Sequence, residues 1–366
     1  ASPIRKLAPL ADAAKQRGVH VFHLNIGQPD LPTPQAAIDA IRNIDRKVLE
    51  YSPSAGNRSY REKLVGYYAK FNINLTADDI IITSGGSEAV LFSFLSCLNP
   101  GDEIIVPEPA YANYMAFAIS AGAKIRTIAT TIEEGFSLPK VEKFEELINE
   151  RTKAILICNP NNPTSSAIST ADMKKLLTVC RSLGIFVMID ETYIEFAPEG
   201  TSLSAVSLVP EFDNFMVIRG VSKFFAAPGL RFGYGLTSNQ AFLQTLLTHQ
   251  NPWSLNSIGA YAGERMLKDI DYIQKTWSLI DSERTRMCTE LSGLDTVKIY
   301  PAYANFVLVK ILKEGLTSFD VFEKAIHQNL MIRDCSSFES LNGEYVRFCI
   351  MNPEDNDRLL DVFRSL

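Results

Sequence analysis

The sequence predicts an α/β protein with two domains: a three-layer α/β/α large domain around a mostly parallel sheet, and a small α+β domain. Through the middle of the chain, short β-rich apolar runs alternate with helical patterns, which is typical of a parallel sheet with helices on both sides. Most of these runs are continuously apolar, as strands covered on both faces are. After Trp253 the pattern changes to long helices and then to a mixed α+β tail.

The expected elements follow from these patterns. Strands are expected at 80–83, 103–106, 124–128, 154–158, 186–190, 215–219 and 232–236, with helices between several of them, for example at 87–98 and 170–183. Residues 258–291 predict one or two long helices, and the tail predicts strands at 306–309 and 345–350 and a helix at 319–328. We therefore expect a large domain over 45–250 and a small domain that combines 1–44 with 251–366.

Composition narrows the class of protein. The 366 residues are 46% hydrophobic and 21% charged, and the net charge is -6 without a long Lys/Arg run, so neither nucleic acid nor a membrane surface is expected as a partner. No apolar stretch of about 18 residues is present, so we expect no membrane span, and we expect no signal peptide. The six cysteines form no CxxC pair, which indicates reduced thiols and a cytoplasmic location.

We expect no metal site, because the four histidines show no ligand spacing beyond the pair His20 and His23. The chain starts at Ala1 without Met, so the sequence leaves open whether it is a piece of a longer fusion protein.

A glycine-rich turn follows the first expected strand. The segment Thr83-Ser84-Gly85-Gly86-Ser87 leads from that strand into a helix. Free N–H groups at a helix start bind an anion, and glycine lets the backbone approach it closely. Gly86 and Ser87 are therefore candidate phosphate ligands. The alternative is a structural turn.

An acid and a lysine end two other expected strands. Asp190 stands where open α/β sheets bind their ligands. A protonated pyridine nitrogen would be a suitable partner for it, worth on the order of 4 kcal/mol at about 4 Å and an effective dielectric near 20. Lys223 follows the expected strand at 215–219, and apolar surroundings would lower its pKa and make it a nucleophilic amine. The alternatives are an aspartate that caps the next turn and a surface lysine.

Two more candidates lie nearby. Arg231, eight residues after Lys223, can neutralise a phosphate. Asn162 lies in the proline-rich segment after the expected strand at 154–158 and can donate to a phenolate oxygen; the alternative is a rigid loop without a ligand. All four segments lie at the C-terminal ends of expected strands, and this combination is specific.

With these segments the sequence resembles the class I/II aminotransferases, the fold-type I enzymes that depend on pyridoxal 5′-phosphate (PLP). The resemblance spans essentially the whole chain. Besides the segments above, it includes residues 25–30, 51–56, 100–103, 107–111 and 345–348.

The resemblance implies a role for each candidate residue. The catalytic group is Lys223, which carries PLP as a Schiff base and shuttles a proton, Asp190, which pairs with the pyridine nitrogen, and Tyr193. The other implied cofactor contacts are Asn162 to the ring oxygen, Tyr111 on the ring face, and Gly86, Ser87, Ser222 and Arg231 to the phosphate. Tyr51 would reach the phosphate of a neighbouring subunit, which implies a homodimer with shared active sites. Arg347, with Asn162 and Gly27 beside it, would bind the substrate carboxylate.

The sequence departs from the family pattern at two positions. Ser165 follows Thr164 where the family usually has glycine, and Gly220 stands three residues before Lys223, where Ser or Thr is common. The second change removes one expected phosphate hydroxyl.

Arg333 bears on the substrate. Its position 14 residues before Arg347 resembles the histidinol-phosphate aminotransferase and threonine-phosphate decarboxylase branch, in which the first arginine binds a distal phosphate. Two arginines favour a substrate with two anionic ends. The alternative is that Arg333 pairs with Asp334, Glu339 or another acid. The first half of the chain instead resembles aspartate aminotransferases.

We therefore expect a PLP-dependent aminotransferase that moves an amino group between a small acidic or phosphorylated amino acid and a 2-oxo acid. The first alternative is a PLP-dependent decarboxylase of a threonine-phosphate-like amino acid, because the two reactions differ only in which Cα bond lies perpendicular to the ring. A remote alternative is a non-catalytic PLP-binding regulatory domain, although no basic helix-turn-helix precedes the resemblance.

Overall fold

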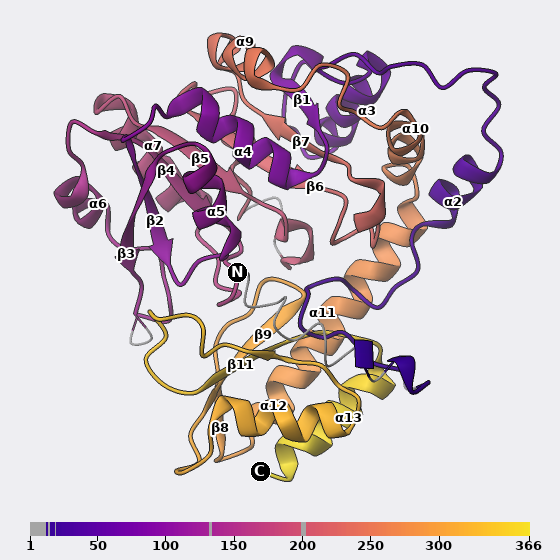
Figure 1. Ribbon diagram of the computed structural model, residues 1–366, viewed down its shortest axis with the longest axis vertical. Coiled ribbons are helices and arrows are strands. Elements are labelled where there is room, and N and C mark those ends of the chain that lie inside the picture. Colours follow the sequence, from indigo (N-terminus) through magenta and orange to yellow (C-terminus); the bar gives the residue numbers. More distant parts are fainter. Residues whose placement is uncertain (1–11, 14, 19, 132–133, 199–202) are drawn as a thin grey trace.

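Two sheets organise the chain in the computed structural model, which describes residues 12–13, 15–18, 20–131, 134–198 and 203–366 (Figure 1). The larger sheet has seven strands in the order β1-β7-β6-β5-β4-β2-β3, and the smaller has four in the order β10-β11-β9-β8. A long helix, α11 (Ile270–Ser292), runs from beside the larger sheet to the smaller one (Figure 1).

All seven strands expected in the large domain are present, and their ends differ from the prediction by two residues at most. They are β1 (Ile80–Thr83), β2 (Glu103–Glu108), β3 (Lys124–Ala129), β4 (Thr152–Cys158), β5 (Phe186–Asp190), β6 (Phe215–Gly220) and β7 (Gly233–Leu236). Strand β7 runs antiparallel to its neighbours β1 and β6, and the other pairs are parallel. The predicted mostly parallel sheet is therefore confirmed.

Helices cover both faces of this sheet. Side chains alternate along a strand, so that Met188 packs with α4 (Gly86–Cys97), α5 (Asn113–Ser120) and α9 (Gln240–His249), while its neighbour Ile189 packs on the opposite face with α7 (Thr170–Ser182). Each buried Ile or Met contributes roughly 1.5–3 kcal/mol through lost contact with water. Other helices around this sheet are α2 (Gln35–Arg42), α3 (Arg58–Ala69), α6 (Val141–Leu147), α10 (Ser257–Met266) and the 3-10 helices η1 (Ala77–Asp79), η2 (Ile194–Phe196), η3 (Ala205–Leu208) and η4 (Pro228–Leu230).

The helical pattern at 258–291 forms two helices, α10 and α11. The break comes at Asp269, whose side chain caps α11 by accepting a hydrogen bond from the N–H of Tyr272 at 3.1 Å. An N-cap aspartate starts a new helix because it satisfies a donor that has no partner inside the helix.

The smaller sheet is antiparallel and takes in the N-terminal segment. Its strands are β8 (Val297–Ile299), β9 (Phe306–Ile311), β10 (Arg333–Asp334) and β11 (Tyr345–Cys349), with helices α12 (Ser318–His327) and α13 (Pro353–Arg364) beside them. Phe22 forms a parallel bridge with Leu330, and the carbonyl of Leu24 accepts from the N–H of Cys349 at 2.9 Å. The domain boundaries at 44/45 and 250/251 stay predictions.

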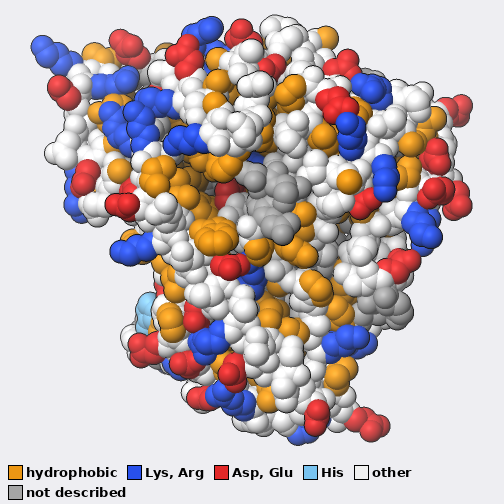
Figure 2. Space-filling model, turned by 180° about the vertical axis from the view of Figure 1, so that it is seen from behind, with side chains coloured by type: hydrophobic (Ala, Val, Ile, Leu, Met, Phe, Trp, Pro, Cys, Tyr) orange, Lys and Arg blue, Asp and Glu red, His pale blue; other side chains and the backbone are white. Residues whose placement is uncertain are grey.

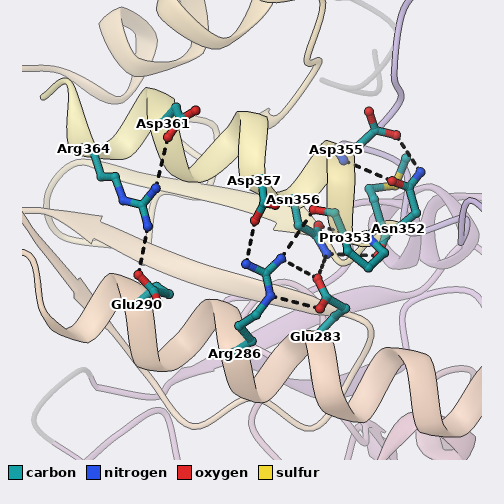
Figure 3. Close-up of polar contacts among 11 residues, drawn as sticks. Glu283, Arg286, Glu290, Asn352, Pro353, Asp355, Asn356, Asp357, Asp361 and Arg364 are labelled. Atoms are coloured by element: carbon teal, nitrogen blue, oxygen red, sulfur yellow. Dashed lines mark hydrogen bonds and ion pairs between the residues drawn. The ribbon is translucent and has the colours of Figure 1, made fainter.

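Polar contacts fasten α13 to α11 (Figure 3). Arg286 of α11 pairs with Glu283 at 2.7 Å and with Asp357 of α13 at 2.6 Å, and Asn356 donates to Glu283 at 2.8 Å. One turn further along, Arg364 joins Glu290 at 2.9 Å. The C-terminal helix is thus held by charge pairs as well as by its buried apolar face.

The surface carries charges of both signs. On the face shown in Figure 2, acidic and basic side chains lie interspersed around a central area of hydrophobic side chains. Among the described residues, no helix is both long and apolar enough to cross a membrane.

Candidate active site

A cavity of about 290 Å³ lies at the carboxyl edge of the seven-stranded sheet. Parallel strands bring the residues that follow them to one edge, and here the ends of β1, β4, β5 and β6 meet. Most of the residues predicted from the sequence line this cavity. They are Gly86, Ser87, Tyr111, Asn162, Asp190, Tyr193, Ser222, Lys223, Arg231 and Arg347.

Lys223 follows β6 and points its amine into the cavity. The Nζ atom donates a hydrogen bond to the carbonyl of Ile26 at 3.0 Å and lies 5.6 Å from the centre of the Tyr193 ring. Burial, together with the positive charges of Arg347 and Arg231, lowers the pKa of Lys223 from 10.5 to about 8, although Cys349 and Asp190 act in the opposite direction. An amine with such a pKa is partly neutral near pH 7 to 8, which makes it a competent nucleophile.

Asp190 ends β5 in a setting that fixes its carboxylate. It accepts hydrogen bonds from the Tyr114 hydroxyl at 2.7 Å, from the Thr192 N–H at 3.0 Å and from the Thr192 hydroxyl at 2.5 Å. All three donors are uncharged, and within the described part of the chain no cationic side chain pairs with this buried carboxylate to offset its burial. Tyr114, which comes from α5, was not predicted from the sequence.

The glycine-rich turn and Arg231 face each other. Gly85 has a φ of 84°, and a Cβ placed there would lie 2.6 Å from the guanidinium of Arg231. Across the turn, a Cβ on Gly233 would lie 2.6 Å from the N atom of Gly86, so no side chain fits at Gly233. The N–H groups at the start of α4 and the arginine therefore converge on one spot, which suits a phosphate group.

Gly220 leaves room beside this spot. A Cβ on Gly220 would meet its nearest atoms, the Phe232 carbonyl and the Gly86 N atom, at 3.5 and 3.6 Å, which is ordinary contact. The neighbouring atoms would therefore accommodate a Ser or Thr side chain at this position, and Gly220 leaves the phosphate without one hydroxyl that the family usually supplies.

Two buried arginines lie side by side on the smaller sheet. Arg347 of β11 stands opposite Arg333 of β10 in the antiparallel register, and their side chains are 3% and 4% exposed. Arg347 donates to the side-chain oxygen of Asn162 and to the Asn25 carbonyl, and its Nε is buried with no partner among the described residues. Arg333 donates to the Ser337 hydroxyl at 2.7 Å.

Both guanidinium groups thus have uncharged partners. The alternative pairing of Arg333 with a nearby acid is not seen among the described residues, because Asp334 instead accepts from Ser318 and Ser336. Burial and the adjacent Arg347 both lower the pKa of Arg333. Arg347 lines the cavity, and Arg333 is its neighbour across the β10–β11 pair. A bound anion would relieve this uncompensated positive charge.

Three other predicted residues lie as follows. Burial raises the pKa of both Tyr111 and Tyr193, so each phenol stays a hydrogen-bond donor at neutral pH. A Cβ on Gly27 would come within 2.8 Å of the Tyr193 hydroxyl, so the chain passes close to that ring. Tyr51 is 80% exposed, is not among the residues that line the cavity, and packs against Trp253 with the ring centres 5.3 Å apart.

A second charge cluster, also not predicted, lies on the opposite face of the sheet. Glu191 directly follows Asp190, and Arg219 directly precedes Gly220. The two side chains form a buried ion pair at 2.7 Å. Glu191 also accepts from the Ser204 hydroxyl and the Ala205 N–H at 2.8 and 2.6 Å. The ion pair links the end of β5, where Asp190 lies, to β6, the strand that Lys223 follows.

The cavity fits PLP by its donor set. It offers a lysine with a lowered pKa for the aldehyde, a buried carboxylate without a cation for the ring nitrogen, and an N–H turn with an arginine for the phosphate. The phenol of Tyr111 at the cavity wall offers a flat surface for a ring.

The comparisons with known proteins agree. The model of the family described as "Aminotransferase class I and II" matches residues 19–363 of this chain. The chain belongs to this aminotransferase family. Because the chain belongs to this family, the protein is a PLP-dependent aminotransferase, and its substrates are an amino acid and a 2-oxo acid.

Similar proteins within the family include a histidinol-phosphate aminotransferase from Methanopyrus kandleri, 29% identical over 92% of this chain and 85% of that protein. A putative threonine-phosphate decarboxylase from Caldanaerobacter subterraneus subsp. tengcongensis is 30% identical over 92% of this chain and 88% of its own. The crystal structure of the histidinol-phosphate aminotransferase from Clostridium acetobutylicum superposes with a TM-score of 0.82 at 25% identity, covering 93% and 98% of the two chains. The predicted fold class is confirmed.

Proposed function

We propose that this aminotransferase acts on a small amino acid that carries a second anionic group, of which a phosphate is the best fit. The observation that carries the proposal is the pair of buried arginines, Arg333 and Arg347, whose partners are all uncharged. Two adjacent buried cations are costly unless anions neutralise them, so a substrate with two anionic ends would complete the site.

The residues of the site divide the work. When bound, PLP supplies an electron-withdrawing ring that stabilises negative charge at the substrate Cα. Lys223 would bind the aldehyde and then take or return the Cα proton through Nζ, for which a pKa of about 8 is well matched. Asp190 would hold the proton on the pyridine nitrogen, and Asn162 and Tyr193 would donate to the ring oxygen.

Other residues would bind and orient. Arg347 would hold the substrate carboxylate, and Gly27 lets the chain pass close beside Tyr193 there. Arg333 would bind the distal anion. The phosphate of the cofactor would be bound by Gly86, Ser87, Ser222 and Arg231, and Tyr111 would stack on the ring.

Decarboxylation is the second candidate reaction. It is favoured by the 30% identity to the putative threonine-phosphate decarboxylase, which is as high as the identity to the aminotransferase from Methanopyrus kandleri. Both names include a phosphorylated substrate, which agrees with the anion proposed for Arg333. Only threonine phosphate also carries a carboxylate and so has two anionic ends, because histidinol phosphate is an amino alcohol. One assay separates the reactions: release of carbon dioxide without a 2-oxo acid would indicate a decarboxylase.

A homodimer is part of the proposal. Tyr51 and Trp253 form an exposed aromatic pair, and Val48 and Leu49 beside them are 65% and 54% exposed. A second subunit would cover this apolar segment and bring Tyr51 to its cofactor phosphate. Sedimentation equilibrium tests the dimer, and a monomer at micromolar concentration would contradict it. The six free cysteines fit a reducing, cytoplasmic setting.

The central experiment compares Lys223→Ala with the control Lys143→Ala, whose lysine is exposed on α6. Borohydride reduction and peptide mapping should place the cofactor on Lys223 in the native protein and find no adduct in Lys223→Ala. Turnover is then measured with 2-oxoglutarate and histidinol phosphate, O-phospho-L-threonine, L-aspartate and L-alanine. A preference for L-alanine would contradict the proposed substrate class.

A further inference from the structure

A second cavity, of about 240 Å³, lies on the opposite face of the large sheet from the active site. Arg219 marks this face, because it alternates along β6 with Ile218 and Gly220, which belong to the active-site side. The described residues that line the two cavities have no member in common. The second cavity is therefore a separate site.

Five aromatic side chains line this cavity. Tyr67, Tyr68 and Phe71 come from α3 or its end, Trp277 comes from α11, and Phe224 follows Lys223. Phe71 and Trp277 are 41% and 38% exposed, so the cavity opens to solvent. Aromatic faces carry partial negative charge and attract cations as well as apolar groups.

Two carboxylates share one guanidinium group beside the cavity. Arg219 pairs with Glu191 at 2.7 Å and with Glu195 at 3.2 Å, so one guanidinium faces two carboxylates. The guanidinium also lies 5.4 Å from the centre of the Tyr68 ring. Burial raises the pKa of Glu195, and Arg219 offsets only part of this effect. A cation bound beside Glu195 would favour the charged form of this carboxylate and balance the cluster.

Glu195 also has an unused acceptor. Its Oε1 atom binds Arg219, but its Oε2 atom is buried and has no hydrogen-bond partner among the described residues. Buried polar atoms are rarely left in this state, and each one indicates either a ligand or a cost in stability. Glu195 lines the cavity, so a ligand there would lie directly beside this side chain.

We propose that this cavity binds a small organic cation with an apolar or aromatic body, held by Glu195 and by the aromatic wall. A carboxylate beside several aromatic rings recognises such a cation through its charge and its flat apolar surface together. An anion of the same shape would meet the excess negative charge and be rejected.

The test uses the PLP-loaded protein and benzyltrimethylammonium as the probe. A quaternary ammonium ion cannot react with the aldehyde of PLP, so any binding is separate from the chemistry of the active site. Benzenesulfonate, which has the same ring and the opposite charge, is the matched control ligand. Binding is measured by isothermal titration calorimetry.

Location is read from tryptophan fluorescence. The chain has two tryptophans, and Trp253→Phe leaves Trp277 in the cavity wall as the sole reporter. The cation should change this emission saturably, with the same Kd as in calorimetry. Glu195→Gln should weaken binding roughly tenfold or more, on the scale of a desolvated cation contact. Glu314→Gln, at an exposed loop position, should leave the Kd unchanged.

Three results would overturn the proposal: no saturable binding of the cation, equal binding of benzenesulfonate, or an unchanged Kd in Glu195→Gln. If Glu195→Gln fails to fold, as judged by circular dichroism, Trp277→Leu serves instead, with a loss of roughly threefold to tenfold expected. An unchanged Kd in that variant would equally exclude the aromatic wall as the binding site.

Discussion

The amine of Lys223 should cost the cofactor-free protein stability, and Lys223→Met should recover it. In the unfolded chain this lysine keeps its proton up to pH 10.5, whereas in the folded protein it releases it at about pH 8. Below pH 8 the folded state therefore carries a penalty of about 3 kcal/mol, which fades as the pH rises from 8 to 10.5. Methionine removes the charge but also the hydrogen bond to the Ile26 carbonyl, worth about 1 kcal/mol.

The net gain is about 2 kcal/mol at pH 7. For 366 residues, with about 2.1 cal/mol/K of unfolding entropy per residue, this corresponds to a rise in Tm of about 3 °C. The assay is differential scanning calorimetry of both proteins without PLP, at equal concentration, at pH 7 and at pH 10. The exposed Lys143→Met is the control and should change little. If Lys223→Met is no more stable at pH 7, or if its advantage persists undiminished at pH 10, the reasoning about the buried amine is wrong.

Three other predictions concern the site. Arg333→Ala should raise KM roughly tenfold to a hundredfold for substrates with a distal anion and leave KM for L-alanine nearly unchanged, since only the former lose a charge-assisted contact; equal effects in steady-state kinetics would make Arg333 structural. Gly220→Ser should lower the Kd for PLP roughly threefold to tenfold, because its Cβ fits and its hydroxyl lies beside the Gly86 N–H; fluorescence titration with PLP checks this, and weaker binding would show that the site lacks the room. Ser165→Ala should destabilise the protein by about 2 kcal/mol in urea unfolding, since the hydroxyl accepts from the N–H groups of Tyr303 and Ala304 at 3.1 and 2.9 Å; a neutral result would make those bonds dispensable.

Much of the large sheet could be predicted because its strands are buried on both faces. Phe186–Asp190 and Ile80–Thr83 are continuous apolar runs, and the structure places both as the sequence indicates. The residues just after such strands must meet at one edge, so Asp190, Asn162 and Lys223 could be grouped without knowledge of the fold. The resemblance to a family added the residues whose local pattern is weak, such as Tyr111 and Arg347.

The contacts made by side chains from distant elements could not be predicted. The hydroxyl of Tyr114 reaches Asp190 from a helix 76 positions earlier in the chain, and nothing in the local pattern of that helix marks it. The ion pair of Glu191 with Arg219 was also missed, because a charged residue just after β5 and another within β6 give no sign of their partner until the strands are paired. In retrospect, charges in strands that are buried on both faces were a usable signal.

Two successive main-chain carbonyls, at residues 25 and 26, accept hydrogen bonds from cations of the site. The carbonyl of Asn25 accepts from Arg347 on the smaller sheet, and the next carbonyl, of Ile26, accepts from Lys223 beside the larger one. Every amino acid supplies the same carbonyl, so these two contacts depend on the path of the backbone and not on the side chains of Asn25 and Ile26. One short stretch of backbone thus ties a cation of the smaller sheet to a cation beside the larger one, so a change that shifts this stretch would disturb both at once.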